Sequence, residues 1–226
     1  MIYDKILPAV FISRPNRFIA EIEVEGKREI SHVKNTGRCK ELLTEGARIY
    51  VQRSDNPARK TKYDLISVYK GQELINMDSQ APNKIFWEWI SAGNFIENIS
   101  LVKPECKYRN SRFDFYIEVD GRKIFAEIKG VTLEENGIVM FPDAPTERGV
   151  KHLNELCECI EDGYDAYIFF IIQMQHCKFF TPNRKTHPEF ADALIEAKEK
   201  GVNIKALNCI VKPDELKIDK PVEIRL

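Results

Sequence analysis

The chain has 226 residues, of which 43% are hydrophobic and 31% charged, and its formal net charge is −1. This composition is typical of a soluble globular protein with one large domain or two small ones. It excludes a long disordered or fibrous chain, and the near-zero net charge does not by itself predict a partner.

Several other classes of protein are also excluded. The six cysteines are scattered without a Cys-x-x-Cys pair, which argues against a zinc site. The longest apolar run, at 166–172, is far too short to span a bilayer. The first ten residues lack the basic start and long apolar run of a signal peptide. We therefore expect a cytoplasmic protein with reduced thiols and no membrane contact.

Residues 1 to about 78 are expected to form short strands. The segment 17–33 alternates apolar and polar residues and turns once, and the segments 46–53 and 63–77 continue the pattern. Several short strands without a convincing long helix indicate a small barrel or sandwich. We favour an all-β barrel of the oligonucleotide/oligosaccharide-binding (OB) type.

The pattern changes at 78–84, a turn-rich segment that indicates a domain boundary. We therefore divide the chain into an OB-like domain, residues 1–80, and a second domain, residues 81–226. The second domain is expected to begin with a helix for which Asn83 is the candidate N-cap. The expected elements are a helix at 83–95, a hairpin at 111–129, a loop at 134–149, a helix at 147–162, a buried strand at 164–174, a helix at 187–201 and a strand at 202–211. Strands that alternate with covering helices indicate an α/β domain.

The predicted hairpin carries the candidate active site. Its Asp120-Gly121 dipeptide is a strong signal for a two-residue turn, and with that turn Asp114 on one strand faces Glu127 on the other. Both side chains are expected to point to the same face, while Phe113 and the other apolar residues of the hairpin point to the opposite face.

Two carboxylates that face each other repel unless a cation or a shared proton separates them. A divalent cation is the simplest solution, and Mg²⁺ or Mn²⁺ suits oxygen ligands with incomplete protein coordination. Lys129 lies two residues after Glu127 and would reach a reacting group bound at the metal. The pattern predicts metal-assisted phosphodiester hydrolysis. In the alternative interpretation the acids face water and pair with Arg112 or Lys129.

A pattern of the form D…ExK across a hairpin is the signature of the PD-(D/E)xK nuclease superfamily, and residues 111–129 resemble it. Six longer segments together resemble the SfsA family, named for sugar fermentation stimulation protein A. They are HVKNTGRCKELL (32–43), SDNPARKTKYDL (54–65), ECKYRNSRFDF (105–115), EIKGVTL (127–133), FPDAPTERGVKHLNEL (141–156) and THPEFADALIEAKEKGV (186–202).

The resemblance covers nearly the whole chain. It implies an N-terminal OB fold, a C-terminal domain of the PD-(D/E)xK nuclease type, DNA binding and a regulatory role in sugar metabolism. By the same resemblance Asp114, Glu127 and Lys129 fall on the nuclease motif. One departure is visible, because the segment YRNSRFD before the motif is shorter than the family pattern.

Other residues of the second domain are candidates for supporting roles. Glu105 precedes the hairpin and is a candidate third metal ligand. Asp143 lies in a loop that is expected to fold over the site, although a turn-forming role is the alternative. On the next helix Arg148, Lys151 and His152 are candidates for contact with a phosphate or with a carboxylate behind the metal ligands. The alternative for this helix is a solvated face.

Cations in the loops between the predicted barrel strands suit backbone phosphates, and such contacts are salt-sensitive without reading sequence. Tyr63 and Tyr69 are candidates for base stacking. Trp87 and Trp89 cannot share a helix face, and we do not expect them to form a stacking platform. The candidate DNA-binding residues are Arg38, Arg53, Arg59, Lys60 and Lys62.

The sequence therefore predicts a DNA-binding protein without sequence preference that carries a nuclease site dependent on a divalent metal. The competing hypothesis is a non-catalytic regulatory module that keeps the nuclease fold and binds DNA. A third hypothesis is a nucleotide or RNA processing enzyme on the same scaffold. The number of subunits is left open, with a homodimer as one arrangement.

Overall fold

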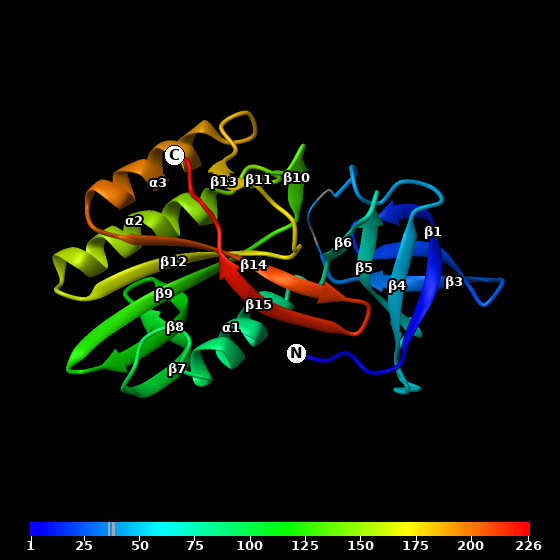
Figure 1. The fold of residues 1–226 in the computed structure, drawn as a ribbon, viewed down its shortest axis with the longest axis horizontal. Coiled ribbons are helices and arrows are strands. Elements are labelled where there is room, and N and C mark those ends of the chain that lie inside the picture. The colour runs from blue at the N-terminus through cyan, green and yellow to red at the C-terminus, as the bar shows by residue number, and fades with distance from the viewer. Residues whose placement is uncertain (36, 38) are drawn as a thin grey trace.

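Six strands form one sheet in the N-terminal part of the chain, as seen in a computed structural model that describes residues 1–35, 37 and 39–226. They pair in the order β3-β2-β1-β4-β5-β6, and a parallel pairing of β3 with β5 closes the first five into a barrel, with β6 added beside β5 (Figure 1). Alternate side chains point inward, and Ile22, Val51 and Leu65 are fully buried. The strands are β1 (Ile6–Asn16), β2 (Ile19–Val24), β3 (Lys27–Val33), β4 (Arg48–Arg53), β5 (Tyr63–Lys70) and β6 (Glu73–Asn76).

The C-terminal part is built on a second six-stranded sheet, in the order β15-β14-β12-β9-β8-β7. Strands β9, β12 and β14 run parallel, and the flanking strands are antiparallel. The sheet consists of β7 (Ile99–Tyr108), β8 (Ser111–Val119), β9 (Arg122–Val131), β12 (Asp165–Ile172), β14 (Asn203–Lys212) and β15 (Glu215–Pro221). A small third sheet contains β10 (Leu133–Glu135), β11 (Ile138–Phe141) and β13 (Phe179–Pro182).

Helices cover both faces of the second sheet. Helix α1 (Ala81–Ser91) packs on one face, and α2 (Glu147–Glu161) and α3 (Pro188–Glu199) pack on the other (Figure 1). Two hydrophobic cores result, one on each face of the sheet. Neighbouring residues of β12 serve both cores, since Phe169 is buried towards α1 and Phe170 towards α2 and α3. This explains why the β12 segment is continuously apolar.

The predicted fold class, a small barrel followed by an α/β domain, is confirmed. Several elements were missed. β1, β7 and β15 were not predicted, and the expected loop at 134–149 contains β10 and β11. β7 is an edge strand with mostly exposed residues, so its sequence lacks the alternation that marks a strand. The N-cap prediction for Asn83 was wrong, because α1 begins at Ala81.

The β8–β9 hairpin follows the predicted register for five pairs, from Val119 with Arg122 to Phe115 with Ala126. The ladder then ends, so the direct pairing of the two acidic residues that the register implied is not formed. Phe113 packs in the core beneath α2, whereas Phe115 packs in the core beneath α1. The expectation that both phenylalanines share one face was therefore wrong, because the side-chain alternation breaks between them.

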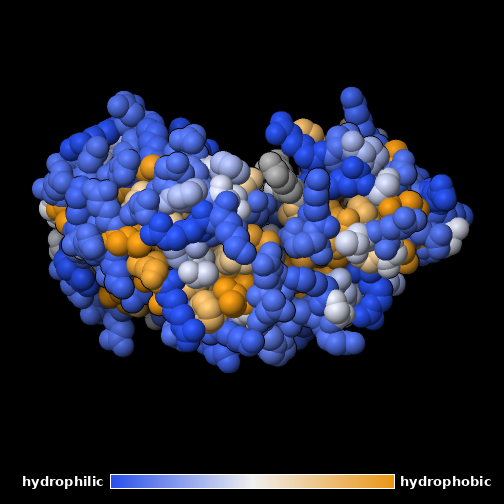
Figure 2. All heavy atoms as spheres, turned by 90° about the horizontal axis from the view of Figure 1, so that it is seen from above, coloured by the Kyte–Doolittle hydropathy of each residue, from blue (hydrophilic) through white to orange (hydrophobic). Residues whose placement is uncertain are grey.

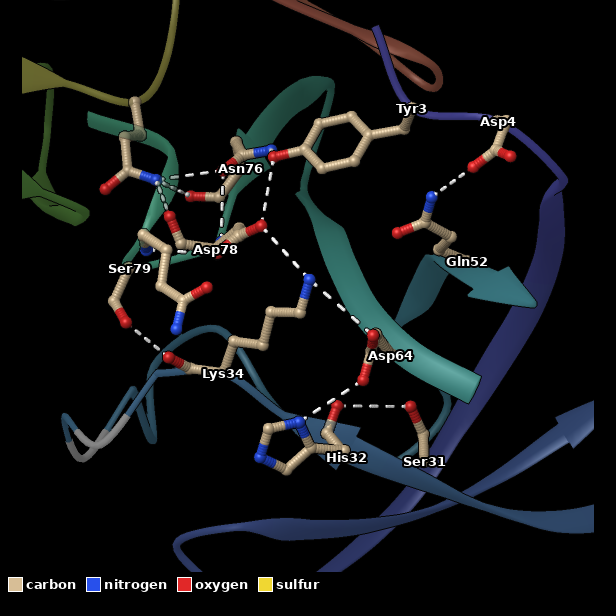
Figure 3. A network of polar contacts seen from close by, with 12 residues as sticks. Tyr3, Asp4, Ser31, His32, Lys34, Gln52, Asp64, Asn76, Asp78 and Ser79 are labelled. Atoms are coloured by element: carbon tan, nitrogen blue, oxygen red, sulfur yellow. Dashed lines mark hydrogen bonds and ion pairs between the residues drawn. The ribbon is translucent and has the colours of Figure 1, made fainter. Parts of the chain in front are cut away.

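A network of polar side chains joins the two domains (Figure 3). The Lys34 ammonium lies 3.6 Å from a carboxylate oxygen of Asp64 in the barrel and 3.4 Å from one of Asp78 in the linker. Both acids are buried, with 4% and 2% of their surface exposed. Gln173 follows β12 and donates hydrogen bonds to the backbone oxygens of Asn76 and Asp78. The barrel is thus bonded directly to the sheet of the second domain.

The linker and the N-terminal residues also connect the two parts. The last barrel strand ends at Asn76, and α1 begins at Ala81. The Met1 ammonium lies 2.6 Å from the Glu88 carboxylate of α1, and the backbone nitrogen of Tyr3 donates to the Asp214 oxygen. In the space-filling view the two domains form two lobes with an indentation between them (Figure 2). Among the described residues, no helix is both long and apolar enough to cross a membrane.

Asp64 is the centre of the junction network, and we expect Asp64→Ala to lower the free energy of unfolding by about 3 kcal/mol. Besides Lys34, it accepts two hydrogen bonds from Arg59. Burial raises the pKa of Asp64, but the hydrogen bonds from Arg59 and the charge of Lys34 outweigh it and hold the pKa below its ordinary value of 3.8. This stabilisation is therefore present above pH 3.8 and is lost as the pH falls through the lowered pKa.

Urea unfolding of the purified variant measures this effect. The matched control is Asp55→Ala, which removes a surface partner of Lys5 and is expected to change stability by less than about 0.5 kcal/mol. Equal midpoints for the two variants would show that the junction network does not stabilise the protein.

Candidate active site

Asp114 lies where β8 leaves its ladder with β9. One carboxylate oxygen accepts a hydrogen bond from the backbone nitrogen of Ile128, and the other accepts one from the Asn83 amide of α1, both at 2.8 Å. Burial and the negative charge of Glu127 raise the pKa of Asp114 to about 6, although these two hydrogen bonds and the Lys129 charge oppose the shift. A carboxylate in this situation favours a cation nearby.

Glu127 has its partner on α2, on the opposite face of the sheet from α1, so the expectation that the two acids share one face was wrong. One oxygen of Glu127, Oε1, accepts from the Lys129 ammonium at 2.6 Å and lies 2.5 Å from Nδ1 of His152 on α2. Only 3% of Glu127 is exposed. Burial raises its pKa, but the hydrogen bond from His152 and the charge of Lys129 outweigh burial and lower it. Glu127 is therefore a carboxylate at neutral pH.

The second oxygen of Glu127 is the informative one. Oε2 is buried and has no hydrogen-bond partner among the described residues. A buried charged oxygen without a partner is costly, and a metal ion would satisfy it. Mg²⁺ is commonly held by one or two carboxylates and keeps several water ligands. The pair Asp114 and Glu127 fits such an ion.

A relay of hydrogen bonds on α2 fixes the orientation of Glu127. The Arg148 guanidinium donates from Nε to Nε2 of His152 at 3.2 Å, so the proton on the ring lies at Nδ1 and is donated to Glu127. The alternative that this helix face is solvated was wrong, because His152 and Glu155 are buried against the sheet. Lys151, in contrast, is exposed and lies 3.8 Å from the Glu155 carboxylate.

The structure places two other candidates away from these contacts. Glu105 lies on β7, where its side chain is 72% exposed and pairs with Arg112 at 3.1 Å. Asp143 follows β11 and packs against Gly37 of the barrel, where even a methyl group would collide with its carboxylate. It lines a cavity of about 110 Å³ at the domain junction, together with Gly130, the residue after Lys129.

The described residues contain no group of three or more His, Cys, Asp or Glu side chains arranged to hold a metal ion. The role of Glu105 as a third metal ligand stays a prediction. Sequence reasoning missed Asn83 as the partner of Asp114. No local pattern signals this contact. Asn83 lies on α1 and Asp114 on β8, and strand β7 separates the two elements along the chain.

The candidate DNA-binding residues of the barrel differ in their availability. The Arg59 guanidinium makes two hydrogen bonds to Asp64 and is held at the junction. Lys60 and Lys62 are exposed and line a shallow depression with Arg28, although Lys62 also lies 3.6 Å from Glu29. These lysines remain the accessible cations of that loop.

The remaining barrel candidates lie in different environments. Arg53 is exposed at the end of β4, and Arg38 lies outside the described residues. Tyr63 is buried in the barrel core, so the expectation that it stacks on a base was wrong. The ring of Tyr69 lies 6.1 Å from that of Tyr50 on the barrel exterior.

Comparison with known proteins covers both domains. The family model described as the SfsA N-terminal OB domain matches residues 12–77, and the model described as the sugar fermentation stimulation protein RE domain matches residues 80–215. A sugar fermentation stimulation protein homolog of Ruminiclostridium cellulolyticum is 60% identical over 226 residues, and one of Clostridium beijerinckii is 58% identical. Both matches cover 100% of each chain.

A solved structure is similar over the same extent. The structure of Pyrococcus furiosus SfsA in complex with Ca²⁺ superimposes with a TM-score of 0.91 at 29% sequence identity. The match covers 100% of this chain and 98% of that one. The arrangement of the two domains is therefore similar in the two proteins.

Proposed function

The chain belongs to the SfsA family, and from this premise we propose that it binds DNA without sequence preference and hydrolyses phosphodiester bonds with a divalent cation held by Asp114 and Glu127. One observation carries the proposal: among the described residues, a buried carboxylate oxygen of Glu127 has no hydrogen-bond partner. Burial and the negative charge of Glu127 together raise the pKa of Asp114, so the two acids interact. The Ca²⁺ complex of the Pyrococcus furiosus relative supports a divalent cation in this fold.

The protein's own groups divide the work around the cation. When bound, Mg²⁺ or Mn²⁺ supplies polarisation of a phosphoryl oxygen and activation of water. His152 fixes Glu127, and Asn83 fixes Asp114, so both carboxylates are oriented before the substrate arrives. The Lys129 ammonium, held by Glu127, would stabilise the charge that develops on the phosphoryl group.

The barrel supplies the sequence-independent part of DNA binding in this proposal. Lys60 and Lys62 contact phosphates, with Arg53 at the end of the neighbouring strand. Arg59 acts from the junction, where Asp64 orients its guanidinium. Contacts of this kind make affinity fall steeply with salt concentration. A cytoplasmic location and a regulatory role in sugar metabolism are part of the proposal through the family alone.

Cleavage assays test the proposal directly. Supercoiled plasmid and single-stranded oligonucleotides are incubated with the protein in Mg²⁺, in Mn²⁺ and in EDTA. Strand breaks that require the metal support the enzyme. A mobility shift on intact DNA would favour the competing regulatory module, and DNA that is neither shifted nor cleaved would refute both.

His152 is expected to act through Glu127, and His152→Ala should weaken Mn²⁺ binding by about 10- to 100-fold. His152→Asn retains a donor near the position of Nδ1 and should restore part of the affinity. Isothermal titration calorimetry measures both, with thermal melting to verify folding. Lys151→Ala on the exposed side of α2 is the matched control, and equal affinities for all variants would remove His152 from the site.

A further inference from the structure

One of the two tryptophans in the chain is exposed near the candidate active site. Trp89 packs against Phe86, Phe95 and Phe169, with ring centroids 5.8 to 6.3 Å apart. Trp87 has 40% of its surface exposed. A single exposed apolar residue needs no explanation by itself, so the position of Trp87 must carry the argument.

One helical spacing and one ring contact place Trp87 near Asp114. Trp87 lies four residues after Asn83, so both side chains project from the same side of α1, and Asn83 donates its amide to Asp114 at 2.8 Å. In addition, the indole of Trp87 lies 6.1 Å from the ring of Phe115, the residue after Asp114. Trp87 is thus a neighbour of the candidate catalytic carboxylate through α1 and through β8.

The indole is supported from one side by the hydrophobic core. The Trp87 and Phe115 ring planes are 29° apart, which is a stacked arrangement. Phe115 is itself buried and lies 5.0 Å from Phe86. A ring that is backed by a packed aromatic pair loses little freedom when a further ring stacks on it. Every nucleobase has such a ring, and stacking on an aromatic side chain is a general means of holding unpaired strands.

A cation lies next to the exposed ring. Lys84 precedes Trp87 by three residues and is exposed on the same helix. Among the residues that the structure describes, Lys84 forms no ion pair, whereas the neighbouring acid Glu88 pairs with the chain's ammonium terminus at 2.6 Å. The combination of an available cation and an aromatic face suits the phosphate and base of a single nucleotide.

We propose that Lys84 and Trp87 form the subsite for the nucleotide next to the scissile phosphate, where Lys84 contacts a phosphate and Trp87 stacks on an unpaired base. The inference rests on the proposed function and specifies its substrate as single-stranded DNA. A fully paired duplex keeps its bases stacked on one another and offers no free base face to Trp87.

The two tryptophans allow a matched experiment. Trp89→Phe leaves Trp87 as the only tryptophan, and Trp87→Phe leaves Trp89 as the only one. An oligothymidylate of about 12 nucleotides is added in EDTA, which prevents metal-dependent cleavage, and binding is followed independently by the anisotropy of a label on the DNA. We expect the tryptophan fluorescence to be quenched in the Trp89→Phe protein and unchanged in the Trp87→Phe protein.

Affinity gives a second readout. Trp87→Ala should weaken oligothymidylate binding by roughly 10- to 100-fold, and Trp87→Phe should retain much of the affinity because a smaller ring still stacks. Mn²⁺ binding should be unchanged in both variants, which distinguishes a lost base contact from a disturbed fold. Lys84→Ala should weaken binding and reduce its salt dependence by about one phosphate contact.

Several results would overturn the inference. DNA binding detected by anisotropy, with constant Trp87 fluorescence and unchanged affinity in Trp87→Ala, would refute the subsite and leave the proposed function intact. Equal quenching by a duplex would refute the assignment to unpaired strands. Quenching by an oligouridylate alone would refute DNA as the ligand. If neither the label nor the fluorescence reports binding, the proposed function itself fails.

Discussion

Asp114→Asn is expected to abolish metal-dependent DNA cleavage and, at the same time, to stabilise the metal-free protein. The loss of activity follows because one of two carboxylates is removed from the cation site. Mn²⁺ affinity should fall by more than about 100-fold, since losing a partner behind a ligand already costs 10- to 100-fold. The gain in stability follows from the environment of the carboxylate in the absence of the cation.

Burial raises the pKa of Asp114 from its ordinary value of 3.8 to about 6, with the charge of Glu127 as the next cause. An acid whose pKa is higher in the folded state favours folding when it is protonated. Its ionisation therefore disfavours folding as the pH rises from 3.8 through 6, by about 3 kcal/mol in total at pH 8. An uncharged asparagine removes this penalty and can still accept from the Ile128 nitrogen, provided that the Asn83 amide rotates to accept in turn.

Thermal melting in EDTA at pH 8 and at pH 5 measures the stability effect, and calorimetric titration with Mn²⁺ measures the binding effect. We expect the Asn variant to melt above the unmodified protein at pH 8 and the difference to shrink at pH 5. Glu118→Gln is the matched control, because it changes an acid on the same strand that accepts a hydrogen bond from Tyr116 at 2.7 Å. A variant that melts lower at pH 8, with no dependence on pH, would contradict the argument.

Lys129→Met is expected to separate binding from catalysis. The ammonium of Lys129 is held 2.6 Å from Glu127, and methionine keeps the apolar stem while removing the charge. Loss of one stabilising donor should reduce the cleavage rate by about 10²- to 10³-fold. Mn²⁺ affinity should be unchanged or tighter, because a positive charge has been removed beside the cation site.

The measurement compares single-turnover cleavage of a labelled oligonucleotide with calorimetric Mn²⁺ binding. Lys123→Met, on the exposed part of the same strand, controls for a general loss of charge and should cleave at the normal rate. Normal cleavage by Lys129→Met would exclude the lysine from the reaction. Loss of Mn²⁺ binding would instead show that it organises the carboxylates.

The sequence predicted the two acids and the lysine of the candidate site because a two-residue turn fixes a register over a short distance. It did not predict where the ladder between β8 and β9 ends. A turn fixes which residues face each other but not how far the pairing continues, because the point at which two strands separate depends on packing. The separation places Asp114 against Asn83 of α1 and Glu127 against His152 of α2. Periodicity grouped the polar residues of α2 correctly but did not reveal that His152 and Glu155 on this face are buried.

Trp87 also shows that periodicity does not determine burial, since this aromatic residue is exposed. Spacing correctly separates it from Trp89, but spacing does not tell which of the two rings meets the core. The outcome depends on Phe115, which contacts Trp87 from a strand far along the chain. Local patterns thus predicted the elements, and contacts between elements decided which side chains are available for function.

The amide of Gln173 connects the barrel to the strand that carries the candidate catalytic residues. Its nitrogen bonds to Asn76 and Asp78, while its oxygen packs so closely on Gly130 that any larger residue there would meet it at 2.6 Å. Gly130 directly follows Lys129. A tilt of the barrel must therefore break these bonds or displace the strand that carries Glu127 and Lys129. A load on the barrel would therefore be transmitted to the strand of the candidate site.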